Sequence, residues 1–150
     1  MSSFIGTEMR KFDQVNRMSI PPQFRSELGS PVVIMKSLHN DPCLLIFSEK
    51  EYDRFSKGIV RTYKGEMQAR AQRQLANRID LASVDKSGRI SLKEDFKKFA
   101  QLNEEMIVVG MDNRIELWDK NIWDEYNDSS DFDFSDTSYS NDFDCAEGER

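Results

Sequence analysis

The sequence predicts an α+β fold built from two copies of one small unit. The main evidence is an internal repeat with a constant offset, because Asp13 and Asp85 are 72 positions apart, and so are Arg17 and Arg89. A repeat of this kind indicates a duplicated supersecondary unit. Short apolar runs alternate with segments of helical periodicity in both halves. Each half therefore reads as strand, turn, strand, helix, strand, turn, strand, helix.

Four strands are expected in the first half, and turn residues or helix signals separate them. Asn40, Asp41 and Pro42 form a turn signal between the last two of these strands. The latter two are continuous apolar runs, which is typical of buried strands. The four predicted strands are residues 4–12, 17–20, 32–35 and 43–47.

Two helices are expected in the same half. The prolines at 21–22 suit the first turn of a helix, and Gly29 ends it. Ser48 is a suitable N-cap for a second helix, whose Tyr52 and Phe55 would face inward.

The middle of the chain, residues 63–78, is the longest helical candidate. Met67, Ala71 and Leu75 recur at every fourth position along it. The plan of the first half then repeats. The predicted strands are residues 79–84, 89–92, 106–109 and 115–118, and the predicted helices are residues 95–102 and a last one capped by Asp119.

The domain organisation follows from the repeat and from the distribution of charge. We expect a first unit at 1–62, a connecting helix at 63–78, a second unit at 79–126 and a disordered acidic segment at 127–150. That segment holds eight Asp and Glu residues against Arg150 alone, a net charge of −7, while the whole chain carries −6. The remaining part is therefore about +1, and can bind phosphates despite the acidic pI of 4.9. Units this small are marginal alone, so we expect them to share a core or to be completed by neighbouring subunits.

Several classes of protein are disfavoured by the sequence. No apolar run approaches the roughly 18 residues of a membrane span, and the N-terminus lacks the pattern of a signal peptide. Cys43 and Cys145 belong to no metal or disulfide motif, which fits a reduced cytoplasm. His39 is the only histidine and reads as a surface turn residue. We therefore expect no enzyme, no metal, no cofactor and no small-molecule substrate.

The two repeated turns carry the candidate functional chemistry. Asp13 and Asp85 can each accept hydrogen bonds from backbone N–H groups two or three residues on, which would structure the loop. The residue before each arginine is Asn16 or Gly88, the types that best tolerate positive φ. Each loop would then point its arginine outward toward a phosphate or a guanine edge. The alternative, two ordinary turns whose arginines form intrachain salt bridges, has equal weight.

Three arginines of the middle helix have a simpler interpretation. Arg70, Arg73 and Arg78 are interspersed with its apolar positions, and Glu66 lies four residues before Arg70. For Arg70 and Arg73 this spacing favours a solvated charged face with an i, i+4 ion pair, or a contact between subunits.

At these residues the chain resembles the MraZ family of bacterial transcriptional regulators. The segment 4–6 stands seven residues before the first Asp–Arg loop, and 85–90 matches the second loop fully. The most specific stretch is 108–118, which resembles the closing signature of the family. The resemblance covers roughly residues 4–126. It implies two tandem swapped-hairpin units of the AbrB type, related by a pseudo-twofold axis.

The resemblance also implies a function. Proteins of this family form rings of about eight or more subunits and bind double-stranded DNA at direct repeats upstream of the division and cell-wall gene cluster. The DNA-contacting residue would be Arg17, with Arg89 as its counterpart, in a cytoplasmic, nucleoid-associated homo-oligomer. Further candidate DNA contacts are Arg10, Lys11, Asn16 and Lys86, and the loop-structuring residues are Asp13, Asp85 and Gly88.

The chain departs from the family pattern in its first loop. Val15 and Asn16 stand where the family usually has Lys and Gly, so one phosphate contact is lost there. Arg10 and Lys11 could offset that loss. A rival function is an antitoxin-like module that binds a protein partner, which the acidic, aromatic-dotted segment 127–150 favours. That segment could alternatively imitate DNA, or be a solubilising extension.

Overall fold

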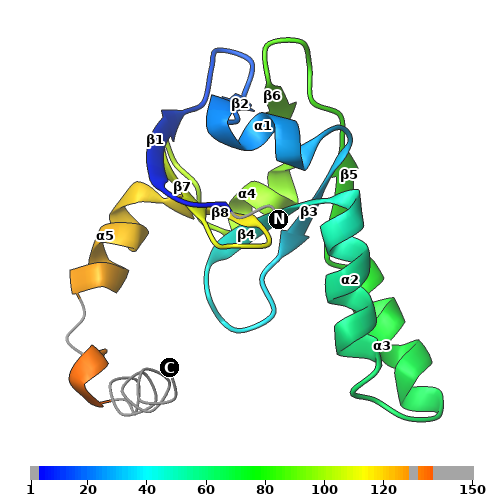
Figure 1. The fold of residues 1–150 in the computed structure, drawn as a ribbon. Helices are drawn as coiled ribbons and strands as arrows, with labels where there is room; N and C mark the ends of the chain where they lie inside the picture. The colour runs from blue at the N-terminus through cyan, green and yellow to red at the C-terminus, as the bar shows by residue number, and fades with distance from the viewer. Residues whose placement is uncertain (1–3, 129–131, 137–150) are drawn as a thin grey trace, which may run out of the picture. The chain divides into compact units, whose positions relative to one another are not determined.

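The structure, a computed structural model, describes residues 4–128 and 132–136 (Figure 1). The chain divides into two compact units, Met1–Lys120 and Asn121–Arg150. These differ from the two repeat units predicted from the sequence, which are called halves below. The order of elements in the first unit agrees with the sequence prediction, with two rounds of strand, strand, helix, strand and strand. In the part of the chain that the structure describes, no helix is long and apolar enough to cross a membrane.

A six-stranded antiparallel sheet forms the centre of the first unit. Its spatial order is β1 (Thr7–Lys11), β7 (Glu105–Gly110), β8 (Ile115–Asp119), β4 (Cys43–Ser48), β3 (Val32–Lys36) and β5 (Ile79–Ala82). The repeat makes β5 equivalent to β1, β7 to β3 and β8 to β4, so the order reads the same from either end. Each edge strand pairs with a strand of the other half, β1 with β7 and β5 with β3. The two halves are therefore joined by backbone hydrogen bonds at both edges of the sheet.

A second, two-stranded ladder joins the repeats at their loops. Strand β2 (Arg17–Ser19) pairs antiparallel with β6 (Arg89–Ser91), and Met18 lies opposite Ile90. Both of these side chains are fully buried, at 0% and 1% exposure. Because side chains alternate along a strand, the residues on either side of this pair face away from the core. The two Asp–Arg loops project from the same side of the sheet (Figure 1).

The hydrophobic core is shared by both halves, as the size of the units predicts. Helix α1 (Pro22–Leu28) contributes Phe24 and Leu28, and helix α4 (Glu94–Phe99) contributes Phe96. These side chains pack in one cluster with alternate residues of the sheet, among them Ile34 and Leu117. Burying each such side chain stabilises the fold by about 1.5–3 kcal/mol, so neither half keeps its core without the other.

Helices α2 (Glu49–Val60) and α3 (Glu66–Ala76) form a hairpin that extends from the sheet (Figure 1). Ser48 caps α2 as predicted, because its Oγ accepts a hydrogen bond from the backbone N–H of Glu51 at 3.1 Å. The expected inward residues pack on the end of β4, where the ring of Phe47 lies 5.8 Å from Tyr52 and 4.9 Å from Phe55. This contact anchors the base of the hairpin.

Several predicted boundaries were wrong, among them that of the helix expected at 95–102, which is Glu94–Phe99. The first strand begins at Thr7 instead of residue 4, because Gly6 has a φ of 112°. The helix expected at 63–78 begins only at Glu66, because Gly65 before it has a φ of 59°. It was expected to be the longest helix, but α2 is one residue longer than α3. Met67, expected on the buried face of this helix, is 47% exposed. The strand expected at 79–84 ends at Ala82.

The second unit contains all of α5 (Lys120–Asp128) but its first residue, and a 3-10 turn, η1 (Phe134–Asp136). The rings of Trp123 and Tyr126 stack on one another in α5, with centroids 6.3 Å apart. Most of the predicted disordered segment 127–150 lies outside the described residues.

Candidate nucleic-acid interface

The first loop is a tight turn organised by Asp13. Its Oδ1 accepts hydrogen bonds from the backbone N–H of Val15 at 2.9 Å and of Arg17 at 2.8 Å. The N–H of Asn16 donates to the carbonyl of Asp13 at 3.1 Å, and Asn16 has a φ of 60°. The prediction of a side-chain-capped loop with a left-handed residue is therefore confirmed, except that the second N–H comes from four residues on.

The second loop repeats this geometry almost atom for atom. Oδ1 of Asp85 accepts from the N–H of Ser87 and of Arg89, both at 2.9 Å. Gly88 donates its N–H to the carbonyl of Asp85 at 2.9 Å and has a φ of 79°. The two loop backbones agree, and Asn16 and Gly88 each occupy the position that requires a positive φ.

Of the two alternatives that the sequence left open, the arginines follow the second: they turn back toward the aspartates and form intrachain ion pairs instead of pointing outward. Nε of Arg17 donates to Oδ2 of Asp13 at 3.0 Å, and Nε of Arg89 donates to Oδ2 of Asp85 at 3.0 Å. Each guanidinium also reaches the other loop, where Arg17 Nη1 lies 3.5 Å from Asp85 Oδ2 and Arg89 Nη1 lies 3.7 Å from Asp13 Oδ2. We call these four residues the Asp–Arg ring. Oδ1 holds the backbone, so Oδ2 remains to bind the cations.

The Asp–Arg ring is electrically neutral. The hydrogen bond from the N–H of Arg17 is the largest influence that lowers the pKa of Asp13, and the N–H of Arg89 lowers that of Asp85 in the same way. Both carboxylates are therefore charged at neutral pH and balance the two arginines. The arginine side chains stay about one-third exposed, at 32% and 34%. Ion pairs at such exposure are weak and exchangeable, so a phosphate can replace the longer contacts between the loops.

The remaining predicted site residues lie around the Asp–Arg ring or on β1. Asn16 and Lys86 are exposed in the two loops, and Lys11 is exposed at the end of β1. Arg10 is half-buried, because its Nη1 donates to the carbonyl of Met9 at 2.8 Å and lies 3.7 Å from Glu8. The structure therefore brings together the two arginines and two aspartates, and leaves Arg10 engaged on its own strand.

Arg25 of α1 is a supporting residue that sequence reasoning missed. Its Nε donates to the carbonyl of Ile20 at 2.7 Å, and its Nη2 donates to Oγ of Ser19 at 3.1 Å. The side chain lies directly against Gly88, so that a Cβ there would overlap it. The backbone N–H of Ile20 also donates to the carbonyl of Gly88 at 2.8 Å. Arg25 thus joins α1 and β2 of the first half to the second loop.

The second half supports the first loop differently. Lys97 occupies the position equivalent to Arg25, and its Nζ lies 4.5 Å from the centre of the Phe12 ring. This cation–π contact stabilises the first loop, but the Lys97 side chain does not lie against the loop backbone as Arg25 lies against Gly88. The position equivalent to Gly88 can therefore be Asn16.

Other chemistries find little support in these residues. Residues 4–128 and 132–136 contain no group of three or more His, Cys, Asp or Glu side chains that could hold a metal ion. Cys43 is 1% exposed, and burial raises the pKa of its thiol to about 12. His39 is exposed in the turn before β4, as expected.

The fold and the site define a small α+β protein with two repeated units, each of which presents one Asp–Arg loop. A family model described as "MraZ protein, putative antitoxin-like" matches residues 3–75 and 80–142, one match for each half. The chain belongs to the MraZ family, which confirms the resemblance seen in the sequence.

Relatives with the name Transcriptional regulator MraZ match most of the chain. The protein of Clostridium tetani is 33% identical over 128 residues, which cover 85% of this chain and 89% of the relative. That of Clostridium acetobutylicum is 34% identical over 128 residues, with the same coverage. That of a Mycobacterium species is 31% identical over 133 residues, or 88% and 92% of the two chains. Transcriptional regulation, which these names describe, is not an enzyme class.

Proposed function

We propose that this protein is a DNA-binding transcriptional regulator whose paired Asp–Arg loops contact double-stranded DNA. The family and the names of the relatives support the general class. The observation that carries the site assignment is the side-by-side placement of two loops with the same hydrogen bonds and one arginine each. Arg17 is the leading contact and Arg89 its counterpart, with Asn16, Lys86, Lys11 and Arg10 as flanking contacts.

The mechanism is an exchange of anions at the Asp–Arg ring. Arg17 keeps its Nε bond to Asp13, which orients the guanidinium, while its Nη groups leave Asp85 for a DNA phosphate or a guanine edge. The loops need not refold, because Oδ1 of each aspartate continues to hold the backbone. Binding releases counterions, so log affinity falls with log salt by about 0.9 for each neutralised phosphate.

The finer parts of the proposal concern assembly and the operator. We propose that each half is a swapped-hairpin unit of the AbrB type, supported by the pairing of β1 with β7 and of β5 with β3. We also propose a ring of about eight or more copies in the cytoplasm, associated with the nucleoid. It would bind direct repeats upstream of a division and cell-wall gene cluster. A ring of subunits suits weak contacts with DNA, because each DNA repeat that is bound raises the effective concentration of the next loop.

The test is DNA binding by the full chain at several salt concentrations. The probe is the DNA upstream of the protein's own gene, and the same DNA with scrambled repeats is the control. Arg17→Ala should weaken binding and reduce the salt slope by about one unit. Lys50→Ala, which removes an exposed charge away from the loops, should change neither. An Arg17→Ala protein with the wild-type affinity and slope would refute the assignment.

The second candidate function is an antitoxin-like module that binds a protein partner. The description of the family model and the neutrality of the Asp–Arg ring favour it, because a neutral surface attracts DNA less than a basic one. A stoichiometric basic protein that co-purifies with the chain, together with no preference for the operator over scrambled DNA, would establish this function instead.

A further inference from the structure

The most basic part of the chain is residues 54–78, which span most of the α2–α3 hairpin and lie away from the Asp–Arg ring. Residues 54–78 contain seven Lys and Arg against Glu66 alone, a net charge of +6. The cations are Arg54, Lys57, Arg61, Lys64, Arg70, Arg73 and Arg78. Since residues 127–150 carry −7 and the whole chain −6, everything else in the chain carries −5. Residues 54–78 and the acidic segment are thus the two charge extremes of this protein.

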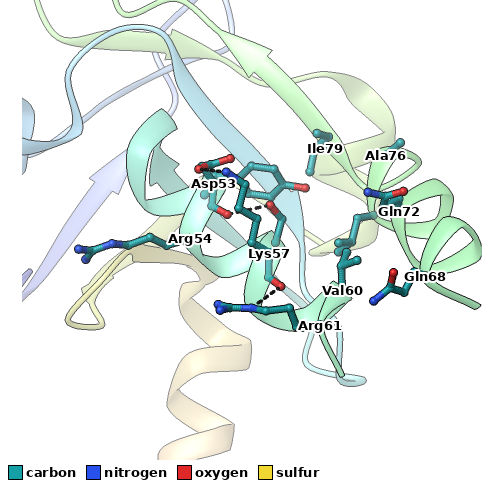
Figure 2. A pocket seen from close by; sticks show the side chains of 12 residues that line it. Asp53, Arg54, Lys57, Val60, Arg61, Gln68, Gln72, Ala76 and Ile79 are labelled. Carbon is teal, nitrogen blue, oxygen red and sulfur yellow. Dashed lines mark hydrogen bonds and ion pairs between the residues drawn. The ribbon is translucent and has the colours of Figure 1, made fainter. Parts of the chain in front are cut away.

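The two sides of the hairpin differ in how far their cations are already paired. The larger groove, of about 1010 Å³, is shown in Figure 2. There Lys57 Nζ lies 2.9 Å from Asp53, and Nε of Arg61 donates to the carbonyl of Lys57 at 3.3 Å. Arg54 lies 3.4 Å from Glu51. Two of the three cations on this side are therefore neutralised by acidic side chains of α2.

The other groove of the hairpin, which we call the hairpin groove, has arginines without acidic partners and exposed apolar side chains. It has a volume of about 400 Å³ and is lined by Leu38, Ile59, Tyr63, Met67, Arg70 and Arg78. Among the described residues, Arg70 and its neighbour Arg73 have no acidic partner within 4.0 Å, and the expected pair with Glu66 does not form. Large apolar side chains are also exposed there, Tyr63 at 42% and Met67 at 47%.

This combination indicates the chemistry of the occupant. A surface that is basic only is satisfied by phosphates, but exposed apolar side chains between the cations require a ligand that is both acidic and apolar. Segment 127–150 has this composition, because aromatic residues alternate with its acids: Phe132, Phe134, Tyr139 and Phe143. Its charge of −7 is opposite in sign to the +6 of residues 54–78.

We propose that the hairpin groove binds the acidic segment, residues 127–150, of a second copy of this chain. The hairpin extends from the sheet (Figure 1), where a neighbouring copy can reach it. The inference rests on the homo-oligomer of the proposed function, but not on DNA binding. The carboxylates pair with Arg70 in the groove and with Arg73, which lies beside the groove three residues further along α3, and the aromatic rings cover Tyr63 and Met67. The acidic segment then links the copies and is no competitor for the Asp–Arg ring.

The test places a photo-crosslinker on the acidic segment of the full chain. Benzophenone maleimide is attached at Cys145, and we expect no attachment at Cys43, because that side chain is 1% exposed and burial raises the pKa of its thiol to about 12. Chain that carries the crosslinker is mixed with ¹⁵N-enriched chain that lacks it, and the subunits of the two oligomers are allowed to exchange. The sample is then illuminated, and crosslinked peptides are assigned by mass spectrometry. We expect crosslinks that join Cys145 to ¹⁵N peptides from residues 54–78. Light scattering and operator binding are measured in parallel.

Charge-reversal variants provide the specificity of the test. Arg70→Glu with Arg73→Glu should reduce these crosslinks about tenfold, because two ion pairs become repulsions. Lys50→Glu with Lys98→Glu reverses two exposed charges elsewhere and should leave them unchanged. Adding Asp142→Lys and Asp144→Lys to the first pair should restore the crosslinks, which a misfolded hairpin could not do.

Three results would overturn the proposal. They are crosslinks confined to a single copy, crosslinks scattered over the surface, and crosslinks that survive the reversal at Arg70 and Arg73. If they survive and the reversal instead weakens operator binding, DNA is the ligand of the hairpin. If the operator is not bound but the crosslinks form as expected, the proposed function fails and this inference stands.

Discussion

Asp13 and Arg89 lie in different halves of the chain, and yet Oδ2 of Asp13 is 3.7 Å from Nη1 of Arg89. The equivalent contact, Arg17 with Asp85, is 3.5 Å. Each aspartate therefore holds the arginine of its own loop and contacts that of the other. The two loops are coupled electrostatically, so removing a charge in one loop changes the stability of the ion pairs in the other.

This coupling should be measurable in a double-mutant cycle. Asp13→Asn and Arg89→Gln, alone and together, should give a small favourable coupling in the free energy of urea-induced unfolding. The coupling should vanish in 1 M salt, because exposed charges are screened there. Asp13→Asn keeps an Oδ1 acceptor for the loop, which isolates the charge. A coupling that persists in 1 M salt would show a contact that is not primarily ionic.

The Asp–Arg ring also predicts an acid-labile contribution to stability. Hydrogen bonds from Arg17 and Arg89 lower the folded-state pKa of Asp13 and Asp85 below 3.8. A depressed pKa contributes stability that is complete above the unfolded value of 3.8 and is lost as the pH falls through the lower folded value. Urea unfolding between pH 6 and pH 2 should show this loss. The Asp13→Asn, Asp85→Asn double variant should lose less stability over the same window.

Gly88→Ala should be more harmful than an equivalent change at Gly65. Both glycines have positive φ, 79° and 59°, which costs an alanine about 1 kcal/mol. A Cβ at Gly65 meets open space, but at Gly88 it overlaps Arg25 and displaces its bonds to Ile20 and Ser19. We expect a loss of about 2 kcal/mol in the free energy of unfolding at Gly88 and about 1 at Gly65. Equal losses would mean that Arg25 moves without penalty.

Gly110→Ala should destabilise the protein because backbone, not side chain, lies against it. A Cβ there would come within 2.6 Å of the backbone nitrogen of Ile5. The N-terminal segment would be displaced, and with it Phe4, which is 3% exposed and packs edge-on against Phe24. We expect a loss of about 2–3 kcal/mol in thermal or urea unfolding. Gly58→Ala, in open space within α2, should instead gain up to about 1 kcal/mol.

Cys43 should be chemically silent in the folded protein. Its thiol is 1% exposed, and burial raises its pKa to about 12, so thiolate is scarce at pH 8. In a Cys145→Ser variant, Ellman's reagent should detect no thiol in the native state and one thiol per chain in denaturant. Rapid reaction in the native state would show that β4 opens locally.

Much of the local structure could be predicted from the sequence. The 72-residue offset located both loops, and the residue types at Asp13, Asn16, Asp85 and Gly88 indicated their hydrogen bonds and positive φ. The order of strands and helices also followed from periodicity. Two of the boundary errors arose at Gly6 and Gly65, whose positive φ interrupts a segment that periodicity alone would continue.

The candidate site was predicted only residue by residue. The constant offset shows that Arg17 and Arg89 are equivalent, but equivalent residues in a repeat need not be neighbours. Their proximity depends on the pairing of β2 with β6, which buries Met18 against Ile90. Arg25 gave no signal, because its role depends on a glycine 63 positions away in the sequence.

The sequence by itself determined the repeat, the order of its elements and the conformation of each Asp–Arg loop, because these depend on interactions between residues close in the chain. Only the tertiary structure decided that β1 pairs with β7 and β5 with β3, and that each aspartate contacts an arginine of the other half. The physical reason is that the halves bury their apolar faces in one shared core. Strand partners are then chosen by burial across the whole sheet, which no local pattern records.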